Sequence, residues 1–126
     1  VLGSSDKSEF MIGYFTKHGD GASDITPIIS LYKLQVRGIA KYLGIPDNII
    51  SKKSSPHLWK DHEAENELGI SYEEIDSVLY CMDKKKLSVE DTEKITMIEK
   101  SKIQKIQELI LKSEHKRLGA QKPDIN

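Results

Sequence analysis

The sequence has one cysteine, few aromatic residues and no long apolar run. Cys81 is the only cysteine among 126 residues, which excludes an internal disulfide and a zinc site built from cysteines. No apolar stretch is long enough to cross a bilayer, so we expect no membrane partner. A reducing compartment such as the cytoplasm fits the low cysteine count. With 37% hydrophobic residues, the chain has material for one modest core.

Neither sign of charge dominates the chain, whose net charge is −1. The distribution is nevertheless uneven. Residues 1–83 carry 8 basic and 13 acidic side chains, whereas residues 84–126 carry 11 basic and 7 acidic ones. The basic end fits an anionic ligand and a solvated helix face equally well.

The segment Gly13–Asp24 contains three glycines, a lysine, a histidine and two aspartates. Such a segment cannot build a core, so its backbone groups must face water or a ligand. Gly19 and Gly21 allow positive φ angles and close approach of a ligand to the backbone. A solvated loop and a binding loop are both compatible with this composition.

The first residues, Val1–Ser5, are typical of a buried strand that ends in a polar turn. A chain that begins at a strand end is expected to be a piece of a longer protein. Asp6 or Ser5 can cap a short helix that carries Tyr14. Glu9, in the first turns of that helix, either complements the helix dipole or faces a nucleotide beyond the strand end.

A second helix is predicted after Pro27, and it stops at Gly44 and Pro46. Lys33 lies in its first turn, where a lysine opposes the helix dipole and a bound phosphate would offset that cost. The apolar residues fall on one helical stripe, which we expect to face the core. This stripe consists of Tyr32, Val36, Ile39, Ala40 and Leu43.

A polar segment, residues 51–67, separates this helix from the rest. Its serines and lysines at positions 51–55 suit a phosphate site, although such clusters are also common in linkers. Trp59 is expected to anchor the loop or to cover a ligand.

Three capped helices are predicted in the last third of the chain. Ser71 and Glu74 form a capping box, and Ile75 begins an apolar stripe beside which Cys81 packs. Ser88 is the next N-cap, and Thr96 with Glu99 suggests another capping box. A final helix buries Ile103, Ile106 and Ile110 and ends in a basic turn, and residues 118–126 are expected to form a loose tail.

Taken together, these stretches resemble the ammonia-dependent NAD synthetase family. They occur in the family's order and cover nearly the whole chain; the run around residues 14–21 is the most specific. The matching stretches are Gly-Ser-Ser-Asp-Lys-Ser-Glu (3–9), Gly-Tyr-Phe-Thr-Lys-His-Gly-Asp-Gly (13–21), Leu-Tyr-Lys (31–33), Ser-Pro-His-Leu-Trp (55–59), Glu-Leu-Gly-Ile-Ser-Tyr-Glu-Glu-Ile-Asp (67–76) and His-Lys-Arg (115–117).

The resemblance implies an α/β fold with a Rossmann-like parallel sheet of the adenine-nucleotide alpha-hydrolase type, and a homodimer. It also implies a two-step reaction in which ATP adenylates deamido-NAD and ammonia then displaces AMP to give NAD. The family's Ser-Gly-Gly-x-Asp-Ser pyrophosphate loop is absent, since no two glycines are adjacent. Residues 1–126 therefore match the mostly helical C-terminal portion of one synthetase domain, which we expect to be inactive alone.

The resemblance also implies roles for individual residues. Glu9 matches a Mg²⁺ ligand, and Asp20 lies where it would orient or deprotonate ammonia. The residues that match ATP contacts are Ser4, Lys33 and Ser55, and those that match deamido-NAD contacts are Lys17, Asp24, His115 and Lys116. Serine replaces a usual threonine at positions 4 and 55.

Two readings from other classes compete with a synthetase. Residues 71–117 could imitate a helix-turn-helix DNA binder, but no helix presents base-reading side chains and the net charge is not basic, so we expect no nucleic-acid partner. A small helical binding or dimerisation module without catalysis is the other reading. It predicts self-association without nucleotide binding.

Overall fold

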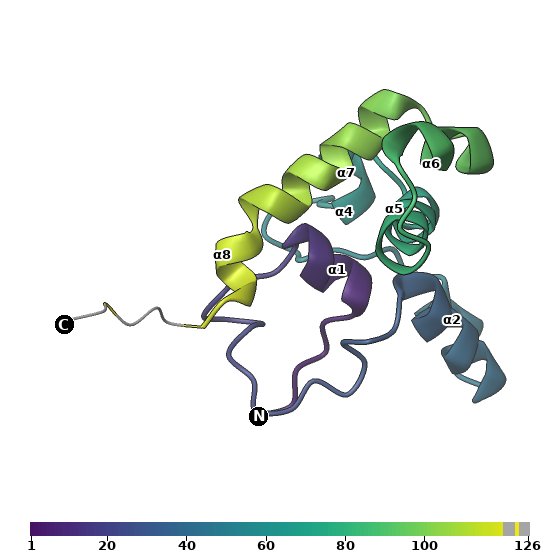
Figure 1. Cartoon of the computed structure of the whole chain (residues 1–126). Coiled ribbons are helices and arrows are strands. Elements are labelled where there is room, and N and C mark those ends of the chain that lie inside the picture. Colours follow the sequence, from purple (N-terminus) through teal and green to yellow (C-terminus); the bar gives the residue numbers. More distant parts are fainter. Residues whose placement is uncertain (120–122, 124–126) are drawn as a thin grey trace.

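The computed structural model describes residues 1–119 and residue 123. Within that range the regular structure is almost entirely helical (Figure 1). Helices α1, α5 and α7 pack against one another, and α8 lies at the end of α7 beside α1. In chain order the elements are α1 (Lys7–Ile12), α2 (Lys33–Tyr42), α3 (Asp47–Ile50), α4 (Ala64–Leu68), α5 (Tyr72–Leu79), the π-helical turn η1 (Tyr80–Lys84), α6 (Val89–Thr96), α7 (Lys100–Lys112) and α8 (Glu114–Arg117).

The expected parallel pairing is reduced to one contact in the described residues. Leu2 and Ile25 form an isolated parallel bridge, in which the Gly3 amide donates to the Ile25 carbonyl at 2.8 Å. Val1 and Leu2 are 81% and 73% exposed, so the prediction that they end a buried strand is wrong for this chain. In the described part of the chain no other strand pairs beside this bridge, so Val1 and Leu2 lack the neighbouring strands that would bury them. The prediction of a mostly helical portion is confirmed.

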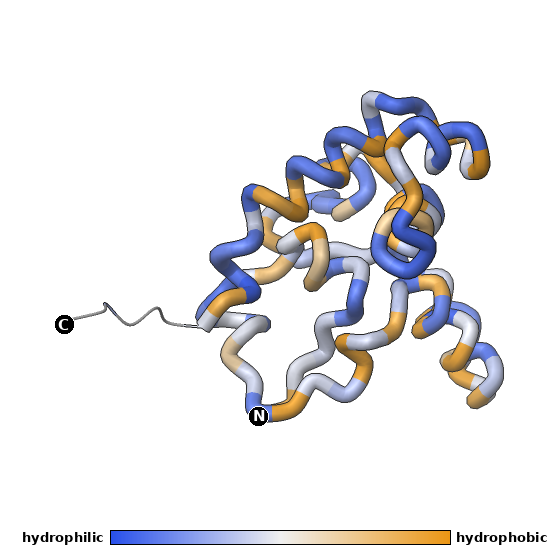
Figure 2. Tube along the Cα trace, viewed as in Figure 1, coloured by the Kyte–Doolittle hydropathy of each residue, from blue (hydrophilic) through white to orange (hydrophobic). Residues whose placement is uncertain are grey.

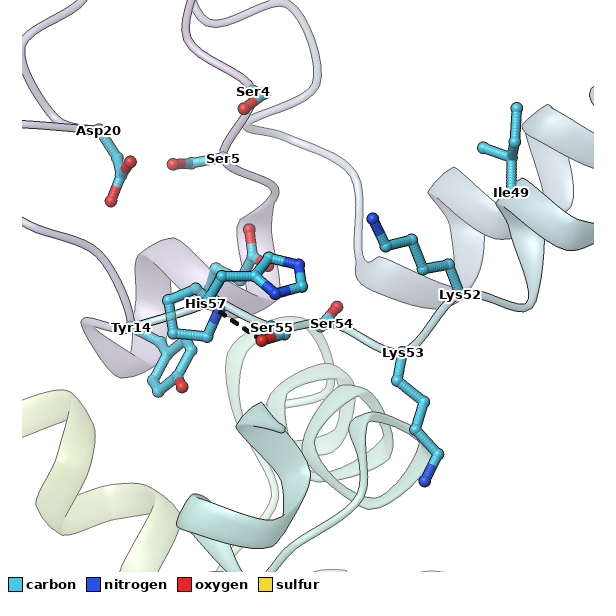
Figure 3. A pocket seen from close by; sticks show the side chains of 12 residues that line it. Ser4, Ser5, Tyr14, Asp20, Ile49, Lys52, Lys53, Ser54, Ser55 and His57 are labelled. Atoms are coloured by element: carbon cyan, nitrogen blue, oxygen red, sulfur yellow. Dashed lines mark hydrogen bonds between the residues drawn. The ribbon is translucent and has the colours of Figure 1, made fainter. Parts of the chain in front are cut away.

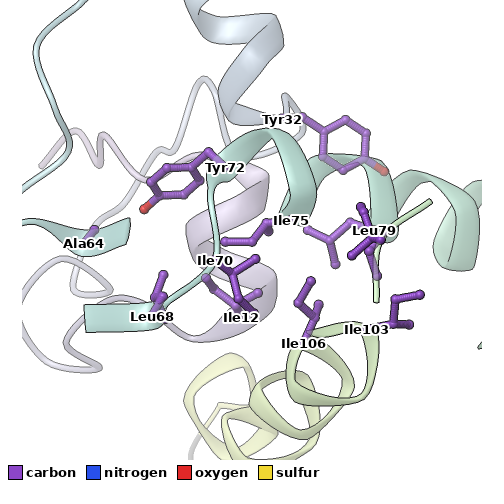
Figure 4. Close-up of a cluster of buried hydrophobic side chains, with 12 residues drawn as sticks. Ile12, Tyr32, Ala64, Leu68, Ile70, Tyr72, Ile75, Leu79, Ile103 and Ile106 are labelled. Atoms are coloured by element: carbon purple, nitrogen blue, oxygen red, sulfur yellow. The ribbon is translucent and has the colours of Figure 1, made fainter. Parts of the chain in front are cut away.

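One apolar core joins the helices (Figure 4). Helix α5 contributes Ile75, Val78 and Leu79, and α7 contributes Ile103 and Ile106, all almost completely buried. These residues fall on the stripes predicted from the sequence. The remaining members of the cluster are Ile12, Tyr32, Ala64, Leu68, Ile70, Tyr72 and Ile98.

The predicted start of α5 is confirmed. Ser71 accepts a hydrogen bond from the Glu74 amide, and the Glu74 side chain accepts one from the Ser71 amide. Cys81 is buried just beyond the helix, as expected for a small packed residue. Local side-chain chemistry is therefore sufficient to fix this element.

The boundary between α6 and α7 differs from the prediction. Ser88 caps α6 as expected, but Thr96 is the last residue of α6 and not the cap of α7. Its hydroxyl donates to the Thr92 carbonyl at 2.7 Å, and Met97 then turns the chain with a φ of 59°. The capping box of Thr96 with Glu99 is therefore wrong, because the hydroxyl is already bonded within α6.

Helix α2 does not bury the stripe predicted for it. Tyr32, which precedes the helix, is buried, but Ile39 and Leu43 are 43% and 67% exposed. Apolar positions, coloured orange, recur along α2 in Figure 2. Helix α2 is bonded to α1 and α5 through its first turn, and Arg37 in the next turn pairs with Glu73 of α5 at 3.2 Å. The rest of the helix leads away from them (Figure 1). Gly44 ends the helix with a φ of 72°, as predicted.

The last predicted helix is divided at Ser113 into α7 and α8. Gly13, with a φ of 73°, packs directly on Ser113, so the end of α1 touches the junction between α7 and α8. Leu118 and Gly119 lie outside regular structure, and most of the expected tail, residues 120–122 and 124–126, falls outside the described range, so the tail stays a prediction. No helix in the described part of the chain is long and apolar enough to span a membrane.

Candidate functional site

A polar cleft of about 460 Å³ lies between the N-terminal turn and the segment that follows α3 (Figure 3). It brings together four of the residues that the sequence singled out, namely Ser4, Glu9, Asp20 and Ser55. These residues come from three separate stretches of the chain. The cleft is lined by Ser4, Ser5, Glu9, Tyr14, Asp20, Ile49, Lys52, Lys53, Ser54, Ser55, Pro56 and His57.

Lys33 is not among the residues that line this cleft, but it forms an ion pair with Glu9, which does line it. Its ammonium lies 2.6 Å from a Glu9 carboxylate oxygen and 2.6 Å from an oxygen of Asp6, which is almost completely buried. Burial and the neighbouring charge of Asp6 raise the pKa of Glu9. Burial alone would lower the pKa of Lys33, but the charges and bonds of Glu9 and Asp6 outweigh it and raise that pKa. The lysine is thus held as a cation beside the cleft.

Glu9 has a structural role as well. It is the third helical residue of α1, and with Asp6 it forms a capping box. The Glu9 amide donates to Asp6 at 2.9 Å, and the Asp6 amide donates back to the Glu9 carboxylate at 3.4 Å. The two interpretations of Glu9, at the helix terminus and at a ligand cleft, are therefore compatible with one geometry.

The first turn of α2 is capped by side chains from two other helices. The Lys33 amide donates to the Ser8 hydroxyl at 2.9 Å, and the Leu34 amide donates to the Asp76 carboxylate at 2.8 Å. Ser8 also donates to Asp76, and both side chains are buried. This arrangement positions Lys33, and sequence analysis missed it. The available signal was Asp76, a carboxylate four residues after Tyr72 on the buried face of α5.

Asp76→Asn is expected to lower the free energy of unfolding more at pH 4 than at pH 7. Asparagine keeps one acceptor where two donors converge, whereas both oxygens of a carboxyl group can accept even when one of them carries a proton. An unsatisfied buried group costs about 1–3 kcal/mol. Burial raises the pKa of Asp76 above its unfolded value, so its stabilising contribution is present at low pH and is lost as the pH rises through the folded pKa. The difference in the free energy of unfolding between the wild type and Asp76→Asn therefore becomes smaller as the pH rises toward 7. Urea denaturation at both pH values, with exposed Asp47→Asn as control, measures this; a pH-independent difference would contradict it.

The loop after α1 holds Asp20 at the rim of the cleft. The Thr16 amide and hydroxyl donate to one Asp20 oxygen at 3.1 and 3.2 Å, and the Asp20 amide donates to the Thr16 hydroxyl at 3.1 Å. Gly19 and Gly21 do not have positive φ angles, contrary to the prediction. A Cβ at Gly19 would lie 2.1 Å from the Thr16 hydroxyl oxygen, so this glycine permits close packing of the loop on itself.

A second cavity, of about 250 Å³, adjoins the cleft and shares Tyr14, Asp20 and Pro56 with it. Behind it the Tyr14 hydroxyl donates to Glu67 at 2.6 Å, and His62 bonds to the same carboxylate oxygen at 2.7 Å. These hydrogen bonds lower the pKa of Glu67. Sequence analysis did not single out this cluster.

Trp59 anchors its own loop, one of the two roles expected for it. Its ring stacks on the buried His62 ring with the ring centroids 3.4 Å apart, while more than half of the indole remains exposed. The Ala64 amide, at the start of α4, donates to the Ser54 carbonyl at 2.9 Å and so ties the segment that lines the cleft to this helix.

The four residues matched to deamido-NAD contacts lie outside the main cleft. Lys17 and Lys116 line a third cavity, of about 380 Å³, whose apolar wall is the stacked pair Phe10 and Phe15. Lys17 also donates to the His115 carbonyl at 2.7 Å. Asp24 is 81% exposed, where its carboxylate pairs with the Val1 amino group. The chain thus brings two of the four together at a cavity and leaves Asp24 and the His115 side chain on the surface.

A comparison with known sequences identifies the family. The sequence model of the NAD synthase family matches residues 1–120. An NH(3)-dependent NAD(+) synthetase from Aeropyrum pernix is 48% identical over 125 residues, which are 99% of this chain and 44% of that protein. The enzyme of the same name from Pyrococcus horikoshii is 51% identical over 117 residues, which are 93% of this chain and 46% of that protein.

Solved structures agree with the sequence comparison. NMN synthetase from Francisella tularensis superimposes with a TM-score of 0.78 at 38% identity, over 99% of this chain and 47% of that one. An NH3-dependent NAD synthetase from Campylobacter jejuni, in complex with the nitrate ion, gives a TM-score of 0.71 at 27% identity, over 98% of this chain and 44% of that one. The chain therefore spans less than half the length of these relatives, and it belongs to the NAD synthase family.

Proposed function

We propose that residues 1–126 form the C-terminal portion of a synthetase domain that converts deamido-NAD to NAD with ATP and ammonia. The observation that carries this proposal is the cleft in which Ser4, Glu9, Asp20 and Ser55 meet, with Lys33 paired to Glu9, in a chain of the NAD synthase family. The rest of the domain would supply a parallel sheet, continued from the bridge at Leu2 and Ile25, and the pyrophosphate loop.

The first step places the charged part of ATP in this cleft. The carboxylate of deamido-NAD attacks the α-phosphorus, and pyrophosphate leaves. Ser4 and Ser55 have hydroxyls that can donate to phosphate oxygens, and Lys33 supplies a point charge for the leaving pyrophosphate. Asp6 also contacts the Lys33 ammonium, so Lys33 would keep one carboxylate partner when Glu9 binds Mg²⁺.

Glu9 is the residue that would hold Mg²⁺. The described residues contain no group of three or more histidine, cysteine or acidic side chains suited to a metal. One carboxylate combined with phosphate oxygens and water fits the coordination that Mg²⁺ usually takes. When bound, the ion would neutralise negative charge on the triphosphate.

The second step requires neutral ammonia beside the adenylated carbonyl carbon. Asp20 faces both the cleft and the 250 Å³ cavity, and its bonds to Thr16 fix its orientation. We assign to Asp20 the orientation of ammonia and the removal of its proton as AMP leaves. Lys17, Asp24, His115 and Lys116 would contact deamido-NAD, and the surface positions of Asp24 and His115 fit a site completed by a second subunit of a homodimer. A cytoplasmic location stays a prediction.

The test is NAD formation by the complete protein that contains this chain, with ATP, Mg²⁺, deamido-NAD and ammonium. Nicotinate mononucleotide is tested in parallel, because one structural relative is an NMN synthetase. NAD production with release of AMP and pyrophosphate would support the proposal. Self-association without nucleotide binding would instead favour a dimerisation module.

Asp20→Asn is expected to lower kcat about 10²- to 10³-fold, because the amide cannot accept the proton that the attacking nitrogen loses once it has bonded to the carbonyl carbon. The loss should diminish at higher pH, where hydroxide can take this proton in place of Asp20. The exposed Asp47→Asn is the matched control and should keep wild-type turnover. An Asp20→Asn enzyme with unchanged kcat across pH would remove Asp20 from the reaction.

A further inference from the structure

Arg117 is a half-buried cation that the proposed reaction does not use. It ends the short helix α8, and its guanidinium donates to backbone groups of two other helices. One nitrogen donates to the Met11 carbonyl at 2.7 Å and to the Ser113 hydroxyl at 2.7 Å, and the other donates to the Ile110 carbonyl at 2.5 Å. The same first nitrogen lies 3.5 Å from the Phe10 carbonyl.

The acceptors of the Arg117 guanidinium are backbone carbonyls and a hydroxyl, and none of them is a carboxylate. No acidic side chain in the described residues forms an ion pair with Arg117, although a partly buried charge needs compensation. The carbonyls of Met11 and Ile110 belong to the last turns of α1 and α7, where helix dipoles place partial negative charge. The planar guanidinium can reach both helix ends at once, which a lysine ammonium cannot do as well.

Two lysines continue this contact into the loop that follows α1. Lys116 donates to the Gly13 carbonyl at 2.7 Å and to the Phe15 carbonyl at 2.9 Å. In return, Lys17 donates from the loop to the His115 carbonyl at 2.7 Å. The loop that carries Asp20 is therefore bonded to α8 in both directions.

Gly13, at the end of α1, packs tightly on Ser113, the residue between α7 and α8. A Cβ at Gly13 would lie 2.0 Å from the Ser113 Cβ. The exit of α1 is thus fixed by packing on one side and by Arg117 on the other. From this exit the chain passes through Thr16, which binds Asp20 directly.

We propose that Arg117 is a positioning residue for the loop 13–22, which it holds through the end of α1 so that Asp20 faces the cleft. The consequence for the reaction rests on the proposed function. Binding of ATP depends on Glu9, Lys33 and Ser55, which Arg117 does not contact. Loss of Arg117 should therefore affect ammonia use and spare ATP use.

Arg117→Gln tests this in two independent measurements. In the chain itself, hydrogen exchange at amides 13–22 should accelerate at least tenfold, while amides of α5 keep their protection. In the complete protein, the KM for ammonium should rise about tenfold or more, and the KM for ATP should stay within twofold. Arg37→Gln, on the α2 surface pair with Glu73, is the matched control and should change neither.

Arg117→Lys separates geometry from charge. We expect the loop protection and the KM for ammonium of Arg117→Lys to lie between those of Arg117→Gln and the wild type. The reason is that the single nitrogen of the lysine side chain cannot bond to both helix ends. Full restoration by lysine would overturn the two-helix geometry, and a parallel rise in the KM values of ATP and ammonium would overturn the positioning role. Unchanged exchange in the loop would overturn the proposal even if the protein forms NAD. Accelerated exchange in a protein that forms no NAD would refute the proposed function and leave the loop contact standing.

Discussion

Glu9→Gln in the complete protein is expected to lower kcat about 10²- to 10³-fold, comparable to removal of one electrostatic contact to a developing charge. The amide keeps the size of the side chain and can still cap α1, but it lacks the charge that would hold Mg²⁺. The Mg²⁺ concentration at half-maximal rate should rise as well. NAD formation measured over a range of Mg²⁺ concentrations gives both quantities.

A surface substitution of the same kind controls for loss of charge alone. Glu108, on α7, is 62% exposed at its side chain and pairs with Lys112 one helical turn away, so Glu108→Gln should leave the rate unchanged. Urea denaturation of both variants shows whether Glu9→Gln acts through folding. Wild-type kcat and Mg²⁺ dependence in the Glu9→Gln enzyme would exclude Glu9 as the metal ligand.

Gly13→Ala is expected to produce the largest loss of stability among single substitutions at glycine. Alanine at a φ of 73° costs about 1–2 kcal/mol. The new methyl group would also lie 2.0 Å from the Ser113 Cβ and 2.5 Å from its hydroxyl oxygen, and such overpacking adds about 1–3 kcal/mol. Urea denaturation of the chain measures the sum.

Gly44→Ala isolates the backbone component of that loss. Gly44 has nearly the same φ, 72°, and nothing lies within 4 Å of the position where its Cβ would be. The difference between the two variants is therefore the cost of the contact between α1 and the junction at Ser113. Equal losses would show that this junction adjusts freely.

Sequence analysis predicted the elements whose determinants are local. The capping box at Ser71 and the stripe that begins at Ile75 lie within one helix, and both were found. Thr96 illustrates the limit of such prediction. Its hydroxyl could accept a hydrogen bond as the cap of α7 or donate one to the Thr92 carbonyl within α6, and the sequence alone favoured the first, which is wrong.

Features that depend on a partner element were not predictable. The stripe on α2 is a regular helical pattern, but whether Ile39 is buried depends on what packs against it. Ser8 and Asp76, which cap α2, lie 25 and 42 positions from their respective backbone partners in the sequence, so no local motif reveals the cap. The resemblance implies roles in one reaction for Ser4, Glu9, Asp20 and Ser55, and all four line the same cleft. Their individual roles stay predictions.

The contacts of α8 have a consequence for the order in which the protein is made. Arg117 and Lys116 bond to acceptors more than 100 residues earlier in the chain. On the ribosome, the segment around Asp20 emerges long before the residues that fix it have been translated. Non-local contacts of this kind also form late during folding. The nascent chain therefore passes through a stage in which its helices can exist while the loop has no fixed path, and α8, which is synthesised later, then fixes that loop.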